Sequence, residues 1–312
     1  MLDFYCPFPR RIHPSAERAQ RRSLRWMRSH ALFEHVSDPG QFERNRYSFL
    51  AAQMLPDSSD ELLQLGADWT NWLFVLDDIF DESPIGRSPA KTRAFIDRVI
   101  ATLYQQAAPD NGIATSLTEL CSRFAALGGQ VALARFAGHI VEYLEACLWE
   151  AENRAAGATP ELAVFELMRS YAGAVRTYLD LAEVAAGVSL PCVVRQHPTL
   201  QRANLAVCNI GCWNNDALSF AKELYSGDSH NLVLVLASEL GLSIDQAADA
   251  VVASCDAEVR VLERMVNDPP NFGSQAANAV ARRYFDALTA MVRGAIDWTA
   301  ETARYREART AA

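Results

Sequence analysis

Two polar segments of the sequence carry side chains whose types and spacing suit the binding of a metal ion. In the first, Asp77 and Asp81 are four residues apart in the run Asp-Asp-Ile-Phe-Asp-Glu at positions 77–82, so both carboxylates lie on one face of a helix. Hard cations such as Mg²⁺ take oxygen ligands, which clustered carboxylates supply. The alternative is a solvated acidic helix end, although the negative pole of the helix dipole makes acidic groups unfavourable there.

The second segment places three different oxygen donors on one helix face. Asn215, Ser219 and Glu223 are spaced at i, i+4 and i+8, so an amide, a hydroxyl and a carboxylate could hold one Mg²⁺. Lys222 lies beside them and can reach the same anion as a point charge. The alternative is the polar stripe of an amphipathic helix. Small residues precede Asn215 on that face and leave space for a ligand: Cys208, Gly211 and Cys212.

Helices must position these side chains, because apolar residues recur at three- and four-residue spacing almost throughout the chain. Alternating strand patterns bounded by turns are absent from the sequence. Ser59 and Ser243 mark two helix starts, and Ser83-Pro84 marks a break after the acidic run. The sequence therefore predicts an all-α protein. The expected helices are 15–35, 58–82, 88–106, 113–127, 128–155, 160–188, 197–225, 230–241, 243–267 and 275–306.

Length and composition limit the classes of function. The chain has 312 residues, of which 50% are hydrophobic, so it can bury a large core and is not disordered. No linker or internal repeat divides it. We expect one domain over 1–312, with a loose N-terminal strap at 1–14 and a frayed tail at 306–312. The formal net charge of −9 argues against nucleic-acid binding, and an acidic enzyme that handles a polyanion would need bridging metal ions.

Cysteine usage and hydropathy indicate the cellular compartment of the protein. The seven cysteines form no C-x-x-C pair, which is typical of reduced thiols in a cytoplasmic protein. The N-terminus lacks the apolar core of a signal peptide. No run approaches the roughly 18 uninterrupted apolar residues of a membrane span. We therefore expect a cytoplasmic location and no membrane partner.

Together, the two polar segments resemble the metal-binding motifs of bacterial class I terpene synthases, most of all the sesquiterpene synthases. The family's aspartate-rich motif and its N-D-x-x-S-x-x-x-E motif face each other across a helical bundle. The resemblance implies a bundle around a central active-site cavity and three Mg²⁺ ions, for which Mn²⁺ could substitute. It assigns two ions to Asp77 and Asp81, and the third to Asn215, Ser219 and Glu223. Three neighbours become further metal ligands or supports of the ligands: Asp78, Glu82 and Asp216.

A further match concerns the diphosphate that the family binds. Arg169 stands 46 residues before Asn215, which is similar to the spacing of the family's diphosphate-sensing arginine. The resemblance then makes Ala172 the linker and Gly173 the effector. A glycine at this position also has a physical reason, because it allows a local helix break that turns a carbonyl toward the cavity. Arg176 is the second candidate for the sensor.

The end of the chain adds a second match. Arg304 and Tyr305 resemble the Arg-Tyr pair with which bacterial members cap the diphosphate, since a guanidinium binds phosphate with two donors and a phenol adds one. Lys222 completes the expected diphosphate-binding set. The sequence also departs from the family pattern. Ser170 stands where many members have a second arginine, and Ala172 where some have a polar linker.

The resemblance implies a Mg²⁺-dependent ionisation of an allylic isoprenyl diphosphate, followed by cyclisation and release of diphosphate. Aromatic faces would stabilise the cation, with Phe74, Trp213 and Trp298 as candidates for the cavity wall. The length of the chain is similar to that of sesquiterpene synthases, which use farnesyl diphosphate. Geranyl and geranylgeranyl diphosphate are the alternatives. We also expect the loops around Ser83 and at 226–229 to close over the site.

Two other functions stay open. A chain-elongating prenyltransferase has a similar bundle, but such enzymes carry two aspartate-rich motifs, and here the second is replaced by the Asn/Ser/Glu pattern. A non-enzymatic helical interaction protein would show repeats and long exposed apolar stripes, which the sequence lacks. Members of the resembled family are often antiparallel dimers, so a homodimer is a further expectation.

Overall fold

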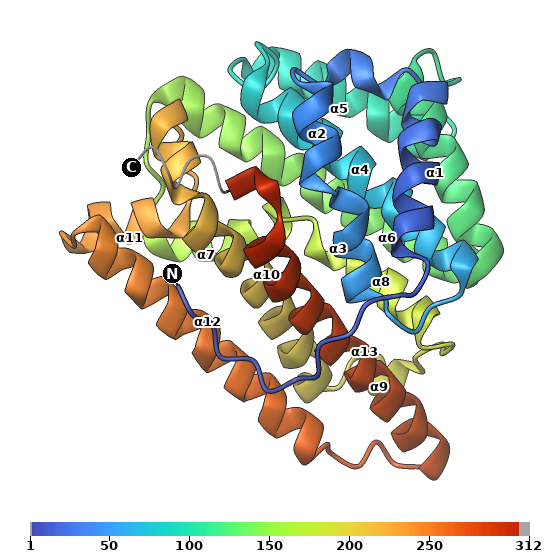
Figure 1. Cartoon of the computed structure of the whole chain (residues 1–312). Helices are drawn as coiled ribbons and strands as arrows, with labels where there is room; N and C mark the ends of the chain where they lie inside the picture. The colour runs from blue at the N-terminus through green and yellow to red at the C-terminus, as the bar shows by residue number, and fades with distance from the viewer. Residues whose placement is uncertain (1, 306–312) are drawn as a thin grey trace.

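A computed structural model describes residues 2–305 of the chain, and every regular element in that part is a helix, as predicted (Figure 1). The expected tail at 306–312 lies outside the described residues. The α-helices in order are α1 (Ala16–Ser29), α2 (Pro39–Asn45), α3 (Tyr47–Met54), α4 (Asp60–Glu82), α5 (Pro89–Leu103), α6 (Gly112–Ala156), α7 (Leu162–Ala172), α8 (Val175–Ala185), α9 (Cys192–Arg195), α10 (Pro198–Ser226), α11 (Leu232–Leu240), α12 (Ile244–Asn267) and α13 (Gln275–Glu301). Two short 3₁₀ helices are η1 (Leu32–His35) and η2 (Ala303–Tyr305).

The helix starts follow the polar signals of the sequence. The Ser59 hydroxyl accepts a hydrogen bond from the Leu62 N–H and caps α4, the helix that carries the acidic run. Ser243 and Gln246 form a reciprocal capping box at the start of α12. These caps satisfy donors that the first helical turn leaves without an intrahelical partner. Both predicted starts are confirmed.

One long helical prediction holds and another divides. The break predicted between 113–127 and 128–155 is confirmed within two residues, because Gly129 takes the non-helical φ of 81° and separates the two halves of α6. The expected helix at 160–188 is in fact two helices, α7 and α8, because the chain breaks at Gly173 and Ala174. Helices α2 and α3 were not predicted. They are short and are separated by Arg46 in the left-handed region, so neither builds a long periodic pattern.

The N-terminal strap is not loose, which corrects the expectation. Figure 1 shows it crossing the faces of α12 and α13. The backbone N–H of Tyr5 donates to Asp256 at 2.8 Å, and its hydroxyl donates to Glu263 at 2.9 Å, both on α12. The N–H of His13 donates to the carbonyl of Ala52 at 2.9 Å. Hydrogen bonds at both ends therefore fix the strap to the bundle.

Among the described helices, α6 is long and apolar enough to cross a membrane when judged by length and composition alone. In the structure it is kinked and packs against α4, α5, α7 and α8. A helix with neighbours on several sides is an ordinary member of a helical bundle.

Helices α3 and α13 approach each other so closely that only glycine fits between them. A Cβ atom at Gly294 would lie 2.3 Å from the backbone carbon of Gln53 and 2.5 Å from the nitrogen of Met54. Backbone atoms cannot move aside as the end of a flexible side chain can. This contact sets the distance between two helices that line the central cavity.

We expect Gly294→Ala to lower the free energy of unfolding by at least about 1–3 kcal/mol, the usual cost of overpacking. Gly138→Ala is the matched control, because a Cβ at Gly138 on α6 would meet no atom within 4 Å. There, removal of a helical glycine should stabilise the protein by about 0.5–1 kcal/mol. Urea unfolding measures both. Equal values for the two variants would contradict the close packing of α3 against α13.

Candidate active site

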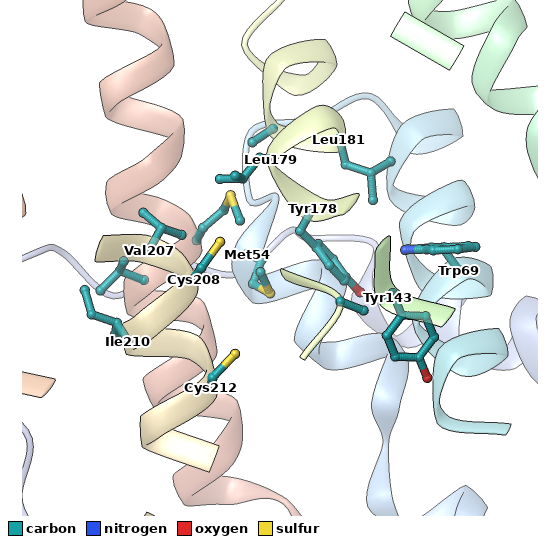
Figure 2. Packing of buried hydrophobic residues seen from close by; sticks show 14 of the residues in the cluster. Met54, Trp69, Tyr143, Tyr178, Leu179, Leu181, Val207, Cys208, Ile210 and Cys212 are labelled. Atoms are coloured by element: carbon teal, nitrogen blue, oxygen red, sulfur yellow. The ribbon is translucent and has the colours of Figure 1, made fainter. Parts of the chain in front are cut away.

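A cavity of about 180 Å³ lies within the bundle, with walls from α3, α4, α6, α7, α8, α10, α13 and η2. Its lining changes in character along the helices. Near the C-terminal ends of α4, α10 and α13 the side chains are charged or polar, and one or more turns earlier in each helix they are apolar. Figure 2 shows Met54, Tyr143 and Tyr178 in the buried cluster that surrounds the apolar part.

The acidic run divides into residues that line the cavity and residues that do not. Asp77 accepts a hydrogen bond from Arg304 at 2.5 Å, and Asp81 accepts one from Arg154 at 2.9 Å, and both line the cavity. Asp78 does not line the cavity; its carboxylate lies 3.6 Å from Arg304, and burial raises its pKa to about 6. Glu82 also lies outside the cavity, where it accepts a hydrogen bond from Ser37 at 2.9 Å. The predicted shared face of Asp77 and Asp81 is thus present.

The second segment presents its three oxygen donors to the same cavity. Asn215, Ser219 and Glu223 all line it. The amide of Asn231 donates to Ser219 at 3.3 Å and to Glu223 at 2.5 Å, and so orients both side chains. Burial, followed by the negative charge of Asp216, raises the pKa of Glu223 to about 7. A cation at this position would relieve the cost of a buried carboxylate.

These donors fit a hard divalent cation by their chemistry. Carboxylate, amide and hydroxyl oxygens are the ligands that Mg²⁺ prefers. Across residues 2–305 there is no group of three His, Cys, Asp or Glu side chains that could hold a metal ion by itself, so the fit depends on the mixed donors of α10 together with Asp77 and Asp81 of α4. Burial and the neighbouring charge of Asp77 also raise the pKa of Asp81, which indicates excess negative charge at this end of the cavity.

Asp216 has a supporting place behind the cavity wall. It is fully buried, and its carboxylate accepts hydrogen bonds from Arg169 Nε at 2.9 Å and Nη2 at 2.6 Å. The N–H of Leu232 donates to its other oxygen at 3.1 Å. Arg169 itself lines the cavity and also donates to Asn215 at 3.1 Å. Asp216 therefore orients Arg169, and through Arg169 the side-chain amide of Asn215, without lining the cavity itself.

The other expected diphosphate-binding groups also reach this end of the cavity. Arg304 donates to the hydroxyl of Tyr47 at 2.5 Å, and the hydroxyl of Tyr305 accepts from Asn215 at 2.6 Å. Lys222 lines the cavity with its Nζ 3.5 Å from a carboxylate oxygen of Glu82. Arg169, Lys222, Arg304 and Tyr305 are thus brought together, although they are far apart in the sequence.

Comparison with known proteins shows the family to which a chain with this cavity belongs. The family model described as terpene synthase family 2, C-terminal metal binding, matches residues 68–261, which include both polar segments. The chain belongs to the terpene synthase family. A (+)-T-muurolol synthase from Roseiflexus castenholzii is 35% identical over 303 residues, which cover 96% of this chain and 92% of that protein. A (+)-eremophilene synthase from Sorangium cellulosum is 33% identical over 309 residues, which cover 97% of this chain and 92% of that protein.

Solved structures of terpene synthases share the fold. A linalool/nerolidol synthase from Streptomyces clavuligerus, in complex with 2-fluorogeranyl diphosphate, has a TM-score of 0.84 at 25% identity, covering 97% of this chain and 100% of that one. A germacradien-4-ol synthase from Streptomyces citricolor has a TM-score of 0.84 at 24% identity, covering 96% and 98%. The expected class I, all-α fold is therefore confirmed.

In this terpene synthase, the break between α7 and α8 lies at the predicted glycine, but for a different reason. Gly173 has an ordinary φ of −77°, and Ala174 takes the left-handed φ of 55° instead. What requires glycine is space, because a Cβ at Gly173 would lie 2.3 Å from the sulfur of Cys212 on α10. The Cys212 thiol donates to the carbonyl of Arg169 at 3.3 Å, and Ala172 and Gly173 both line the cavity.

The structure places two further residues that the sequence analysis discussed, Arg176 and Ser170, away from the cavity. Arg176, the second candidate for the sensor, does not line the cavity and lies instead 3.5 Å from Glu142 and over the ring of Tyr171. Ser170 is buried and donates to the carbonyl of Leu167, away from the cavity. The departure at this position therefore removes no side chain from the cavity wall of this terpene synthase.

Two of the three aromatic side chains expected at the cavity wall line the cavity. Phe74 and Trp298 line the cavity, with ring centroids 5.6 Å apart, and Phe74 stacks on Tyr47 at 3.8 Å. Trp213 does not line it and packs in the hydrophobic core. Its position is about 200° round the helix from Gly211 and from Asn215, so it faces the opposite side.

The sequence motifs missed several groups at the polar end. Arg154 and Glu150 of α6, and Asp228 and His230 of the α10–α11 loop, all line the cavity. Arg154 Nη1 and His230 Nε2 are buried without a hydrogen-bond partner, which fits a site that takes a polar ligand. Arg154 could not be found from sequence, because an arginine near a helix end is commonplace. The polar run after α10 was the available signal for Asp228 and His230.

We expect Gly173→Ala to lower the free energy of unfolding by about 1–3 kcal/mol, because the new methyl group would overlap the Cys212 sulfur. Cys212→Ala in the same chain should recover most of that loss, since the nearest remaining side-chain atom would be the Cys212 Cβ at 3.7 Å. Urea unfolding of the two single variants and the double variant gives the coupling free energy between positions 173 and 212. Additive losses would mean that the sulfur is not what excludes a side chain at 173.

Proposed function

We propose that this chain ionises farnesyl diphosphate in a metal-dependent step, cyclises the resulting allylic cation to a sesquiterpene and releases diphosphate. The observation that carries the proposal is the division of one cavity into a polar end and an apolar end. Oxygen donors from α4 and α10 meet four diphosphate-binding candidates at the first end, and aliphatic and aromatic side chains form the second. Such a cavity suits a molecule with an anionic head and a hydrocarbon tail.

The metal proposal assigns ligands to both helices. Asp77 and Asp81 would hold two Mg²⁺ ions, and Asn215, Ser219 and Glu223 the third, with Mn²⁺ able to substitute. The family model describes a metal-binding domain, which supports divalent metal use. Bound metal would supply Lewis-acid neutralisation of the departing diphosphate. Asp78, Glu82 and Asp216 do not line the cavity, so a supporting place suits them better than direct ligation.

The basic residues would stabilise the negative charge that develops as the carbon–oxygen bond breaks. Arg169 donates two hydrogen bonds to the Asp216 carboxylate, so its guanidinium is oriented before the substrate arrives. Donors fixed in advance in a dry site stabilise a developing anion more than mobile ones do. Arg304, Tyr305 and Lys222 would complete the contacts to the leaving group. The substrate thus loses its diphosphate without covalent work by the protein.

The apolar end would hold the hydrocarbon and exclude water. The faces of Phe74 and Trp298 line this space, and an aromatic face stabilises a cation by about 0.5–2 kcal/mol. Exclusion of water protects the cation from early quenching. The loops around Ser83 and at 226–229 would close over the polar end. Asp228 already lines the cavity, which supports a role for the second loop.

The names of the relatives support farnesyl diphosphate over shorter or longer prenyl chains. The muurolol synthase is named for cyclising (2E,6E)-farnesyl diphosphate, and so is a 31% identical 4-epi-cubebol synthase from Streptosporangium roseum. Relatives are matched over more than nine-tenths of this chain, which supports one catalytic domain. All seven cysteines are free thiols, as suits work in the cytoplasm. A homodimer stays a prediction, for which light scattering after gel filtration is the test.

The first test is incubation of the protein with geranyl, farnesyl and geranylgeranyl diphosphate, with and without Mg²⁺, and analysis by gas chromatography and mass spectrometry. We expect a Mg²⁺-dependent cyclic sesquiterpene from farnesyl diphosphate alone. Asp77→Ala and Asn215→Ala should lower its formation by at least about a hundredfold, because each removes a metal ligand. Asp97→Asn on α5, an exposed carboxylate, is the matched control.

Other outcomes of this assay are equally clear. A product from geranyl or geranylgeranyl diphosphate instead would assign a monoterpene or diterpene synthase. A longer prenyl diphosphate, formed when isopentenyl diphosphate is added as the second substrate, would mean chain elongation. Folded protein that releases no diphosphate from any of the three substrates would contradict the proposed function.

A pair of hydroxyl groups interrupts the apolar part of the cavity. Thr70 donates to the carbonyl of Gly66 at 2.6 Å, so the hydrogen bond between Thr70 and Tyr178 must use the phenolic proton of Tyr178. Both side chains line the cavity. With its proton engaged, the Tyr178 oxygen can offer the cavity only lone pairs. An oxygen of this kind attracts a carbocation, and we infer that it influences where the positive charge rests during cyclisation.

We expect Tyr178→Phe to change the ratio of terpene products while total diphosphate release stays within about tenfold of the original rate, since the ionising groups are untouched. Tyr284→Phe is the matched control. Tyr284 is a buried tyrosine that donates to Asn204 at 3.2 Å and does not line the cavity. The measurement is the product profile by gas chromatography. An unchanged profile in Tyr178→Phe would rule out the inferred influence.

A further inference from the structure

Arg154, near the C-terminal end of α6, joins two parts of the polar end that are far apart in the sequence. Its Nη2 donates to Asp81 of α4 at 2.9 Å, and its Nε donates to Asp228 of the α10–α11 loop at 2.7 Å. Asp81 and Asp228 do not bond to each other in the described contacts, so the guanidinium is their link. Its side chain is only 14% exposed, and Glu150 lies 3.5 Å from Nη2.

The loop end of this link is itself tightly held. Asp228 accepts hydrogen bonds from the ring Nδ1 of His230 at 2.7 Å and from the His230 N–H at 3.0 Å. Burial opposes ionisation of Asp228, but these hydrogen bonds and the charge of Arg154 keep its pKa well below the usual range. The His230 ring stands edge-on to Trp149 of α6, with centroids 5.5 Å apart. Asp228, His230 and Trp149 thus form one packed unit.

The same loop is bonded to the metal-binding face of α10. Asn231, the N-cap of α11, donates to Ser219 and Glu223 and also to the carbonyl of Asp216 at 2.9 Å. The loop therefore contacts α10 through Asn231 and contacts α4 through Asp228 and Arg154. A displacement of the loop would move hydrogen-bond partners of both predicted metal-binding segments at once.

We propose that Arg154 is a positioning residue that couples Asp81 to the α10–α11 loop. Its contacts would then fix the positions of the predicted metal-binding ends of α4 and α10 relative to each other. The proposal rests on the proposed function, since it concerns the same diphosphate site. Removing one partner of a buried ion pair leaves an uncompensated charge, so the loss of either partner destabilises the arrangement strongly. Arg93 offers a contrast, because its ion pair with Glu145 joins α5 and α6 on an exposed face.

The binding test uses inorganic pyrophosphate with Mg²⁺, measured by isothermal titration calorimetry. We expect Arg154→Gln and Asp228→Asn each to weaken binding by about tenfold or more, and the double variant to be no weaker than the worse single variant, because both break one link. Arg93→Gln should stay within about twofold of the original protein. Thermal unfolding of each variant confirms that it is folded at the temperature used.

The possible results separate the two proposals. If the original protein fails to bind Mg²⁺-pyrophosphate, the diphosphate site of the proposed function is overturned, and the coupling with it. If it binds, but Arg154→Gln and Asp228→Asn bind equally well or their losses multiply in the double variant, only the coupling is overturned.

A second readout requires no ligand. The Trp149 emission is obtained as the difference between the protein with Trp149 and a Trp149→Phe variant. We expect Arg154→Gln to shift this difference spectrum to longer wavelength, because Asp228 and His230 would no longer be held against the indole. Arg93→Gln should leave it unchanged. A difference spectrum that is identical with and without Arg154 would overturn the proposal, because the loop would then hold its position independently.

Discussion

The buried ion pair between Asp216 and Arg169 is the interaction on which the polar end of the cavity depends. Asp216 is on α10, Arg169 is on α7, and the N–H of Leu232 brings the start of α11 to the same carboxylate. Because the group is fully buried, its charge is tolerable only while these donors stay in place. Three helices are thus held in register around the side chain of Asn215.

Negative charge is concentrated at this end of the cavity, and the helix dipoles add to it. The C-terminal ends of α4 and α10 both point there, where acidic groups are least favourable. Arg154 and Arg304 offset part of this charge through Asp81 and Asp77. Carboxylates gathered at this end cost stability, as polar groups at functional sites commonly do.

Helical spacing was sufficient to predict which side chains of one helix face the cavity together. Asp77 and Asp81, and likewise Asn215 and Ser219, share a face because the α-helix fixes their angular relation. Trp213 was proposed for its aromatic ring alone, although the same spacing places it about 200° round the helix from Asn215 and so on the opposite face. Arg154 shows a second limit. Its role arises only where α4, α6 and the α10–α11 loop meet, and no local pattern encodes that meeting.

The N-terminal strap and η2 lie on the same helix, which has a consequence for how the chain is made. The strap contacts α13 through the bond from Arg293 to the carbonyl of Cys6, and α13 leads directly into η2 with Arg304 and Tyr305. During synthesis on the ribosome, η2 emerges after every other described element of the site. The polar end of the cavity therefore gains Arg304 and Tyr305 only after α13, the helix that the strap contacts, has been made.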